Sequence, residues 1–389
     1  MVAKSILMYV LLIVLPDLYI YLHYLRHHKH FTWWKTILWW MPCVLLLAYT
    51  AFLFAEPNFA PDDQSVLFWF LMLFGLLAVP KAAFAVCSFI GWRWCRWWHK
   101  RRNWGNLLGL GLALFCIYVV IYGSTIGFSK LEVRHIEYTS SAVPNAFDGY
   151  KIVLFSDAHV GSYSGRAQRI LARAIDSINA QRADAIVFAG DLQNIHPQEL
   201  YEHRSLLGSL RAKDGIFSVL GNHDYAFYVN VSDAEKVANE REIIRLERQF
   251  GWDLLLNEHR TIYRGNDSIV IAGMENDGRP KQSPNVDIEK TMLGVTDSAL
   301  TVMIQHDPSS WKRTILPKSN AQLTLSGHTH GGQFAFLGFS PIMLKGGEIN
   351  GRYEQDGRTL YVTAGLGALI PFRFGVTGEI VVITLHSAP

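Results

Sequence analysis

Four long apolar segments fill the first 126 residues of this 389-residue chain, and they limit its fold more than any other feature. They cover residues 5–25, 36–55, 66–90 and 105–126. Each offers the ~20 mostly apolar residues that a helix needs to cross a bilayer. Buried helices of a soluble core are the alternative, but these residues do not supply a core large enough to cover all four. The sequence therefore predicts four transmembrane helices, with the lipid bilayer as a partner.

The start of the chain allows a second interpretation, which is a cleaved signal peptide. Residues 5–25 are long for that role, lack a small-x-small cleavage site and lead into a basic, histidine-rich turn at 26–30. A retained span is therefore favoured. The run from His27 to His30 has metal-ligand residue types, but a solvated turn beside the membrane is the favoured interpretation.

Two of the spans carry a charge, Asp17 in the first and Lys81 in the third. Counted from the basic loops, both lie about 13–15 Å from the membrane interface at ~1.5 Å per residue. Each follows a proline, which frees backbone carbonyls for a polar side chain. An unpaired charge at this depth costs about 2.5–3.5 kcal/mol on insertion scales. We predict that the two residues pair across the first and third spans; the alternative is that Lys81 extends to the interface while Asp17 is protonated.

The loops between the spans predict the orientation of the chain. Basic residues collect in the first loop (Arg26, Lys29, Lys35) and the third loop (Arg93, Arg96, Lys100, Arg101, Arg102), whereas the second loop has the acidic Glu56, Asp62 and Asp63. Basic loops tend to stay in the cytoplasm. The N-terminus, with only Lys4, is then outside, and an even number of spans places the second part of the chain outside too. We predict a multi-pass plasma (inner) membrane protein with an extracytoplasmic C-terminal domain.

The charge balance separates this second part from the first. Residues 1–126 hold ten Lys or Arg and four Asp or Glu, whereas residues 127–389 hold 26 and 29. A net negative second part argues against a nucleic-acid partner. All four cysteines lie in the first part, so the second has no disulfide and no thiolate metal site. We expect a transmembrane domain over 1–126, a connector over 127–146 and a separate domain over 147–389.

The second part alternates short apolar strands with helices. Strands are expected at 151–156, 185–189, 216–220, 261–264, 268–272, 300–305, 322–326, 359–363 and 379–385, and helices at 164–180, 198–210 and 233–250. The early βαβαβα rhythm indicates an α/β sheet with helices on its faces. Few helices separate the late strands, which predicts mixed or antiparallel pairing there.

Metal-ligand side chains directly follow five of these strands. They are Asp157 and His159, then Asp191, then Asn222 with His223 and Asp224, then His306, and last His328 and His330. In open α/β sheets, sites form at the carboxyl ends of strands. Oxygen and imidazole ligands suit Mn²⁺, Fe or Zn²⁺ rather than soft-metal chemistry. The sequence therefore predicts a metal centre at this edge.

The joint order of these motifs resembles the calcineurin-like metallophosphoesterase family over about residues 150–385. The motifs are Asp-x-His, Gly-Asp, Gly-Asn-His-Asp and Gly-His-x-His-Gly-Gly. The resemblance implies a metal-dependent phosphoesterase with an α-β-β-α sandwich of mixed sheets and two divalent ions. Mn²⁺ is the expected ion, with Fe or Zn²⁺ as alternatives.

The resemblance also implies roles for single residues. One ion would be held by Asp157, His159, Asp191 and His330, and the other by Asp191, Asn222, His306 and His328. The shared Asp191 makes physical sense, because two cations ~3.5–4 Å apart need negative charge between them. His223 would protonate the leaving-group oxygen, with Asp224 orienting it.

One position departs from the family pattern. The acidic residue that commonly stands three positions after the second motif's aspartate is Asn194 here. Because that acid does not itself bind metal, its loss is expected to alter hydrogen bonding more than metal binding. Arg373 is a candidate substrate-binding residue, which would contact a phosphate group or a metal-binding loop. The alternative is that it forms a surface salt bridge.

Resemblance to one branch of the family suggests a class of substrate. The run Gly-His-Thr-His-Gly-Gly-Gln and the later segment 360–367 look like the membrane-anchored bacterial branch. That resemblance implies hydrolysis of a phosphodiester or pyrophosphate bond, as in a UDP-linked diacylglucosamine. The apolar residues Phe334, Phe336, Leu337, Phe339, Ile342, Met343 and Leu344 would form a lip for acyl chains, or else an ordinary strand and core. Two further interpretations stay open: a tethered enzyme for soluble substrates, and a non-catalytic membrane scaffold or receptor.

Overall fold

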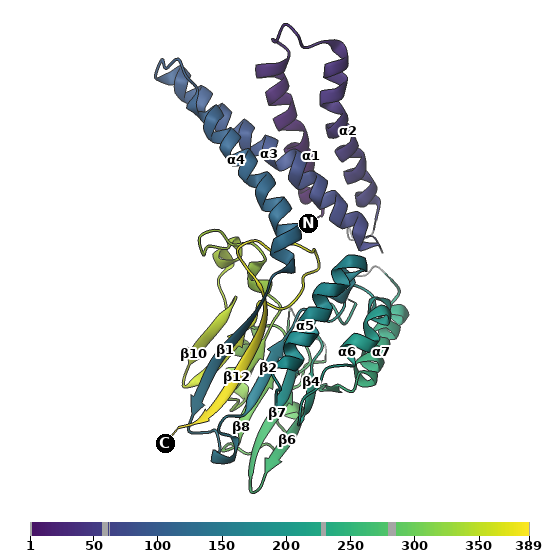
Figure 1. Ribbon diagram of the computed structural model, residues 1–389, viewed down its shortest axis with the longest axis vertical. Helices are drawn as coiled ribbons and strands as arrows, with labels where there is room; N and C mark the ends of the chain where they lie inside the picture. Colours follow the sequence, from purple (N-terminus) through teal and green to yellow (C-terminus); the bar gives the residue numbers. More distant parts are fainter. Residues whose placement is uncertain (1, 57–60, 62, 227–230, 279–284, 389) are drawn as a thin grey trace. The chain divides into compact units, whose positions relative to one another are not determined.

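The computed structural model of the protein describes residues 2–56, 61, 63–226, 231–278 and 285–388. The chain divides into two compact units, Met1–Thr125 and Ile126–Pro389 (Figure 1). We call the first the membrane unit and, after the activity that the sequence resemblance implies, the second the catalytic unit. Asp62, one of the acidic residues of the second loop, lies outside the described residues, as does Pro389.

The membrane unit consists of long apolar helices. They are α1 (Val2–Ile20) with a π-helical turn η1 (Tyr21–Leu25), α2 (Trp33–Ala55), α3 (Gln64–Trp97), and α4 (Trp104–Tyr122) with a π-helical turn η3 (Gly123–Gly127). Within the described residues, four helices are long and apolar enough to cross a membrane, which confirms the four predicted spans. The 34 residues of α3 extend over about 51 Å, more than the ~30 Å of a hydrocarbon core. Helix α3 is therefore longer than the apolar layer is thick, and its C-terminal end carries Arg93 and Arg96.

The predicted pair of charged residues is present between α1 and α3. Lys81 Nζ lies 2.7 Å from Asp17 Oδ1, and the Asp17 residue is 2% exposed. The same ammonium lies 4.7 Å from the ring centroid of Trp39 on α2. The Trp39 indole N–H in turn donates to the Asp17 carbonyl at 3.4 Å. One ion pair thus joins three helices.

The catalytic unit contains two six-stranded mixed sheets. The first has the order β1 (Leu131–Ser140), β12 (Gly378–Ser387), β2 (Lys151–Phe155), β3 (Ala185–Phe188), β4 (Gly215–Ser218), β5 (Asp253–Leu254). The second has the order β10 (Gly351–Gln355), β11 (Arg358–Val362), β9 (Leu323–Ser326), β8 (Leu300–Ile304), β7 (Asp267–Gly273), β6 (Glu258–Arg264). Strands β2 to β5 run parallel, as do β7, β8, β9 and β11, whereas β12 is antiparallel to β2.

Period-two alternation explains why the sheets stack. In β2, Val153 and Phe155 join the core under the helices, whereas Ile152 and Leu154 join the core between the sheets. Side chains of successive strand residues point to opposite faces, so a strand that is apolar throughout must be covered on both sides. The second sheet repeats this rule, because Ile271 faces the first sheet and Ala272 faces outward into a third core.

Helices cover the outer face of each sheet. On the first sheet lie α5 (Gln168–Ala180), the 3-10 turn η7 (Pro197–His203), α6 (Arg204–Leu207) and α7 (Asp233–Gln249) (Figure 1). On the second lie α8 (Ile288–Thr291), η9 (Trp311–Ile315) and α9 (Leu316–Lys318). Short 3-10 turns are η4 (Asn145–Phe147), η5 (Val160–Tyr163), η6 (Gly165–Ala167), η10 (His330–Gly332) and η11 (Pro341–Lys345). The layers confirm the predicted α-β-β-α sandwich.

The segment 127–146, expected as a connector, is instead part of the domain. Its residues 131–140 form β1, which pairs in parallel with β12 from Leu131↔Gly378 to Ser140↔Ser387. The apolar residues of β1 change face along the strand: Leu131 and Val133 pack on the helix-side core, and Ile136 and Tyr138 on the core between the sheets. This change of face hides the period of a strand from a sequence-based prediction. The short β5 and the edge strand β10 were not predicted either.

Candidate metal centre

The carboxyl ends of five parallel strands meet in the catalytic unit. β2, β3 and β4 are neighbours in one sheet, and β8 and β9 are neighbours in the other. The loops that follow these strands are bonded to one another. The Asp157 N–H donates to Gly190 O at 2.8 Å, and the Gly327 N–H donates to His306 O at 3.1 Å. The His328 N–H donates to Asp157 Oδ2 at 3.0 Å, which joins the two sheets at this edge.

The structure brings the seven predicted ligands together as two clusters. One is Asp157, His159 and His330, and the other is Asp191, His306 and His328; a third group of His159, Asp191 and His223 overlaps both, and within each group the ligand atoms lie within 4.8 Å of one another. Asp191 Oδ2 lies 3.1 Å from His306 Nε2 and 3.8 Å from His159 Nε2, so it stands between the clusters. The seventh residue, Asn222, has its Oδ1 3.1 Å from His306 Nε2.

Five of the seven residues have left-handed backbone conformations. The φ angles are +48° at Asp157, +45° at His159, +61° at Asp191, +74° at His328 and +53° at His330. For residues other than glycine such conformations cost on the order of 1–3 kcal/mol each and cluster at functional sites. The fold therefore holds these side chains in place against a local preference.

Two glycines of the motifs are needed because candidate ligands approach their backbone closely. A Cβ at Gly221 would lie 2.2 Å from Asp191 Oδ1, and a Cβ at Gly327 would lie 2.4 Å from Asp157 Oδ2. Any larger residue would push a candidate ligand out of position. The glycines that precede Asn222 and His328 are therefore part of the site's geometry.

Backbone carbonyls fix the orientation of two imidazoles. His306 Nδ1 lies 2.7 Å from Ala189 O, and His330 Nδ1 lies 3.2 Å from Gly367 O. A carbonyl oxygen can only accept, so Nδ1 of each ring carries the hydrogen and Nε2 presents the lone pair to the cluster when the ring is neutral. Metal-binding histidines commonly have this arrangement.

The His159 ring supports a metal in a second way. It is fully buried, and among the described residues neither of its nitrogens has a hydrogen-bond partner. Burial and the nearby His223 hold the pKa of His159 well below its usual value, so the ring is neutral. A neutral buried imidazole without a partner has the form that a divalent cation needs as a ligand. The donor set of the site therefore fits metal ions.

Asp191 is ionised in spite of its burial. Burial alone would raise the pKa of its carboxyl, but the charge of His306 and its neighbours outweighs this effect and holds the pKa well below its usual range. An ionised carboxylate at this point is suited to two clusters that share it.

His223 and Asp224 lie beside the clusters but do not act as a pair. His223 Nδ1 lies 2.6 Å from the main-chain carbonyl of Asn194, which therefore orients the ring. Asp224, expected for that role, instead accepts backbone N–H groups from Asp191 at 2.8 Å and from Gly221 at 2.8 Å. Its carboxylate points toward the loops that follow β3 and β4, because the N–H groups of those loops need an acceptor. Burial and the nearby Asp191 charge raise the pKa of Asp224 to about 7.

Sequence reasoning missed Glu199, which holds the loop that orients His223. Its carboxylate accepts the N–H groups of Asn194 at 2.6 Å, Ile195 at 2.9 Å and His196 at 3.0 Å. The Asn194 side chain donates to Ser162 Oγ at 3.1 Å. Glu199 lies in η7, eight residues after Asp191 and outside the motifs, and its signal in the sequence is a capping-box pattern that starts at His196.

Arg373, predicted as a substrate contact, lies behind the site. It is fully buried, and its Nη2 donates to the carbonyls of Ala364 at 2.8 Å and Gly367 at 2.6 Å. Gly367 O also receives His330 Nδ1, and the Gly367 N–H donates to Asp157 O at 2.8 Å. The guanidinium thus holds the loop that supports two candidate ligands, and its burial does not suit contact with a substrate.

Comparisons with known proteins agree with this geometry. Residues 3–128 match the family described as "Probable Calcineurin-like phosphoesterase, transmembrane domain", and residues 150–332 match "Calcineurin-like phosphoesterase". The metallophosphoesterase YkuE of Bacillus subtilis is 32% identical over 68% of this chain and 91% of its own length. Cj0846 of Campylobacter jejuni is 28% identical over 70% of this chain and 67% of its own. A transmembrane protein with metallophosphoesterase domain from Danio rerio is 29% identical over 71% of this chain but only 62% of its own.

The fold, the site and these matches define a metal-dependent phosphoesterase, a hydrolase anchored in a lipid bilayer by apolar helices. The chain belongs to the calcineurin-like phosphoesterase family, with the four-helix membrane domain of its membrane-anchored members. Its cofactors are divalent metal ions and its substrate is a phosphate ester.

Proposed function

We propose that this enzyme hydrolyses a phosphodiester or pyrophosphate bond in a lipid-linked substrate such as a UDP-linked diacylglucosamine. One divalent ion would be held by Asp157, His159, Asp191 and His330, and a second by Asp191, Asn222, His306 and His328. Two divalent ions, when bound, neutralise phosphate oxygens and lower the pKa of water. The observation that carries the hydrolytic assignment is the convergence of these side chains from five strand ends.

His223 supplies the proton in this proposal. Because its Nδ1 donates to the carbonyl of Asn194, its Nε2 is the atom that can give a proton to the leaving-group oxygen. The carboxylate of Glu199 keeps that carbonyl in position. Mn²⁺ is the ion we propose, since carboxylate, amide and imidazole ligands suit it, as they also suit Fe and Zn²⁺.

An exposed apolar surface beside the site supports a lipid-linked substrate. We call the side chains of Phe336, Leu337, Phe339, Met343 and Leu344 the apolar lip; all are exposed, with Leu337 at 91% and Leu344 at 79%. They follow His330 closely along the chain, in a loop and in η11 rather than in a strand. Large exposed apolar side chains next to a site mark contact with an apolar partner.

Matched substrates test this proposal. The full-length protein with Mn²⁺ is assayed on a lipid diphosphate in mixed micelles and on soluble bis-nitrophenyl phosphate. Changing Leu337 and Leu344 to Ser should lower turnover of the lipid about tenfold or more, because two apolar contacts are lost, and leave the soluble ester unchanged. Leu293→Ser, which alters another exposed leucine, is the control. Equal effects on both substrates would favour soluble substrates, and no hydrolysis of either would favour a non-catalytic scaffold.

We also propose that the catalytic unit lies outside the cytoplasm, at the plasma membrane. The basic residues of the first and third loops support this orientation. A reporter that matures only in the cytoplasm, fused after Pro389, should give no signal. Its fusion to the turn between α3 and α4 should give a strong signal. The reverse pattern would invert the topology and with it the site of any substrate.

A further inference from the structure

The membrane unit holds a cavity of about 750 Å³ at the turn between α3 and α4. Its lining has an apolar wall from both helices, which includes Trp94, Trp104 and Leu108, and a polar end with Lys100, Arg101 and Arg102. A cavity with one cationic end and one apolar wall fits a ligand that is itself anionic at one end and apolar at the other.

Hydrogen bonds hold the turn that forms the cationic end. Cys95 Sγ donates to Arg102 O at 3.0 Å. Asn103 caps α4 by accepting the Gly105 N–H at 3.0 Å, and its amide donates to Ser88 O at 2.9 Å. The two helices touch here, because a Cβ at Gly105 would lie 2.1 Å from Cys87 O. The cavity is therefore built by the fold rather than left by loose packing.

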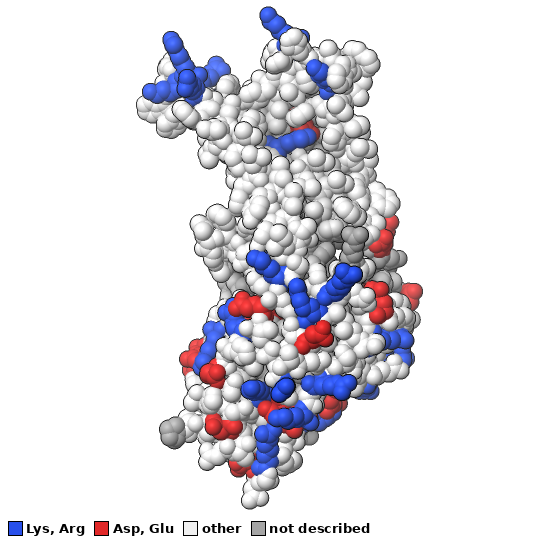
Figure 2. All heavy atoms as spheres, viewed as in Figure 1, with Lys and Arg blue, Asp and Glu red and all other residues white. Residues whose placement is uncertain are grey.

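The three cations lack acidic partners. Within the described part of the chain, none of them forms an ion pair, and the sequence has no Asp or Glu between Lys81 and Glu132. Figure 2 shows positive side chains gathered at this end of the unit with no negative side chain beside them on that face. The cavity also lies at the N-terminus of α4, whose dipole favours an anion.

An apolar groove continues from the cavity along α4. This second cavity, of about 600 Å³, shares Trp104 and Leu108 with the first and extends past Gly111 and Leu112 to Phe115. From Trp104 to Phe115 the helix rises about 16 Å, a length that suits much of an acyl chain. A Cβ added to Gly111 would have nothing within 4 Å, so the floor of the groove is open.

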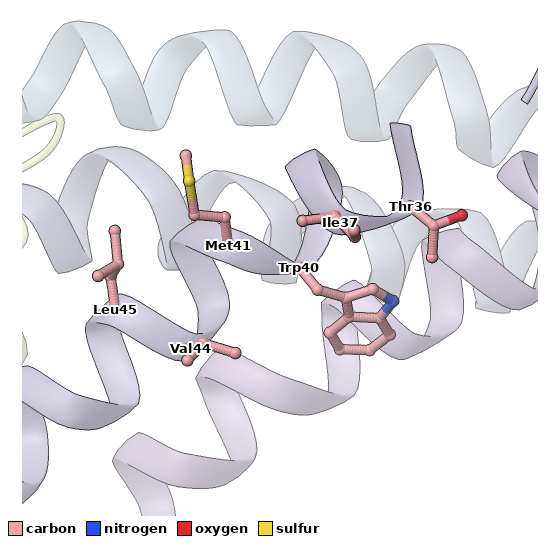
Figure 3. Close-up of a pocket in the computed structure, with 6 residues that line it drawn as sticks. All are labelled: Thr36, Ile37, Trp40, Met41, Val44 and Leu45. Carbon is pink, nitrogen blue, oxygen red and sulfur yellow. The ribbon is translucent and has the colours of Figure 1, made fainter. Parts of the chain in front are cut away.

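A recess elsewhere in the membrane unit shows which feature is specific to the α3–α4 cavity. On α2, a recess of about 420 Å³ is lined by Thr36, Ile37, Trp40, Met41, Val44 and Leu45 (Figure 3). None of these side chains is charged, so the recess offers nothing to hold a headgroup. Apolar hollows alone are ordinary on a helix that faces lipid, whereas the α3–α4 cavity adds a cationic end to its apolar wall.

We propose that the α3–α4 cavity and the α4 groove together bind one anionic phospholipid. Its phosphate contacts Lys100, Arg101 and Arg102, and one acyl chain lies along Trp104, Leu108 and Phe115. This lipid site belongs to the membrane unit and does not depend on which substrate the catalytic unit hydrolyses.

Native mass spectrometry of the full-length protein in detergent tests the site. Phosphatidylglycerol and phosphatidylcholine with the same acyl chains are titrated separately. Phosphatidylglycerol should bind more tightly, with about one molecule per chain retained. Replacing Lys100, Arg101 and Arg102 by Gln should weaken its binding about 100-fold, because each cation near an anionic lipid contributes about fivefold.

A matched variant separates a built site from general attraction. Replacing Arg26, Lys29 and Lys35 by Gln removes the same number of cations from the other basic loop, and none of these three lines the α3–α4 cavity. It should change phosphatidylglycerol binding little. Equal losses in the two variants, or equal binding of the two lipids by the native protein, would overturn the proposal.

The groove is tested independently with Gly111→Leu. This change fills open space and favours a helix, so the protein should fold, which its elution as a single species verifies. It should weaken phosphatidylglycerol binding several-fold while leaving the weak binding of inorganic phosphate unchanged. If inorganic phosphate competes as well as the lipid, or if Gly111→Leu has no effect on the lipid, the acyl chain does not occupy the groove and the proposal fails.

Discussion

In the membrane unit, Asp17 meets Lys81 at 2.7 Å, and each of these two charges within the spans has its opposite beside it. In the catalytic unit, Asp157, Asp191 and Asp224 are all buried within one edge of the sheets, and imidazole rings lie beside Asp191. Burial and the Asp191 charge raise the pKa of Asp224 to about 7, which reflects this crowding. The first arrangement is complete without a ligand, whereas the second gathers carboxylate and imidazole groups that could hold metal ions.

The contrast has a physical cause. Lipid offers neither water nor ions to a stranded charge, so a charge that remains in a span is stable only with a partner of its own chain. The catalytic unit has solvent and metal ions within reach, so it can hold a costly cluster that a cofactor completes. The following experiments either break this contrast or make it quantitative.

The largest effect is expected at Asp191. Asp191→Asn removes the charge that stands between the two clusters, so the metal content should fall from about two ions per chain and activity should fall by more than the ~10²–10⁴-fold expected for loss of a general acid. Elemental analysis of the purified protein measures the first effect. Native protein with well under one ion per chain after growth in Mn²⁺ would refute a two-metal site.

Loss of His223 should come next. His223→Ala should keep its metals and lose roughly 10²–10⁴-fold in kcat for esters with poor leaving groups. The loss should shrink for nitrophenyl esters, whose leaving groups need no proton. Equal losses on both kinds of ester would show that His223 positions substrate instead.

Glu199→Gln should give a smaller version of the same pattern. The change weakens the acceptor of three backbone N–H groups and so loosens the carbonyl that orients His223. We expect about a 10–100-fold loss on poor leaving groups, a lesser loss on nitrophenyl esters and an unchanged metal content. A uniform loss on all esters, or lost metal, would mean that Glu199 supports the fold in general and not His223 in particular.

The ion pair of the membrane unit is tested with a double-mutant cycle. Asp17→Leu and Lys81→Leu each strand one charge, so each should lower stability in detergent by up to about 2.5–3.5 kcal/mol. The double variant should recover most of that loss, because neither charge remains. Thermal unfolding of the four proteins gives the coupling. Single losses that simply add would show that the contact contributes no coupling energy.

The smallest effect is expected at His386, which ties β12 to the start of the domain. Its ring nitrogens lie 2.8 Å from Glu137 Oε2 and 3.1 Å from Asp148 Oδ1. The hydrogen bond to Glu137, and then that to Asp148, raise the pKa of His386. The stabilisation is therefore fully present below about pH 6.5 and is lost as the pH rises through the raised folded value. Melting of His386→Gln should differ from the native protein at about pH 5.5 and converge with it at high pH; a constant difference would contradict this.

Much of the site was predictable because its candidate ligands lie in short motifs that directly follow apolar strands. Asp157, Asn222 and His328 each follow an apolar strand closely, and the carboxyl ends of parallel strands must meet at one edge. The Asp17–Lys81 pair was predictable for a similar reason, since depth in the bilayer follows from counting residues along a helix.

What escaped prediction depends on the main chain and on distant residues. The partner of His223 is the main-chain carbonyl of Asn194. Because every residue type has a main-chain carbonyl, the identity of the side chain at this position does not predict the contact. Glu199 acts on the same loop by accepting backbone N–H groups, and its capping-box pattern does not reveal that it orients His223. The β1 strand escaped because its apolar residues cover two different cores on opposite faces.

The position of β1 at the edge of the first sheet affects how a truncated protein without the membrane unit should be designed. A soluble version that begins after the expected connector, at residue 147, would lack the outermost strand of the first sheet. The backbone of β12, now paired along its whole length, would then present open N–H and C=O groups over an apolar strand, which is a template for fibril-like association. A version that begins near Phe128 keeps β12 paired with β1 and the Phe128 ring packed against Tyr163 at a centroid distance of 5.4 Å. Aggregation of the shorter version would thus reflect a missing strand and say nothing about the need for lipid.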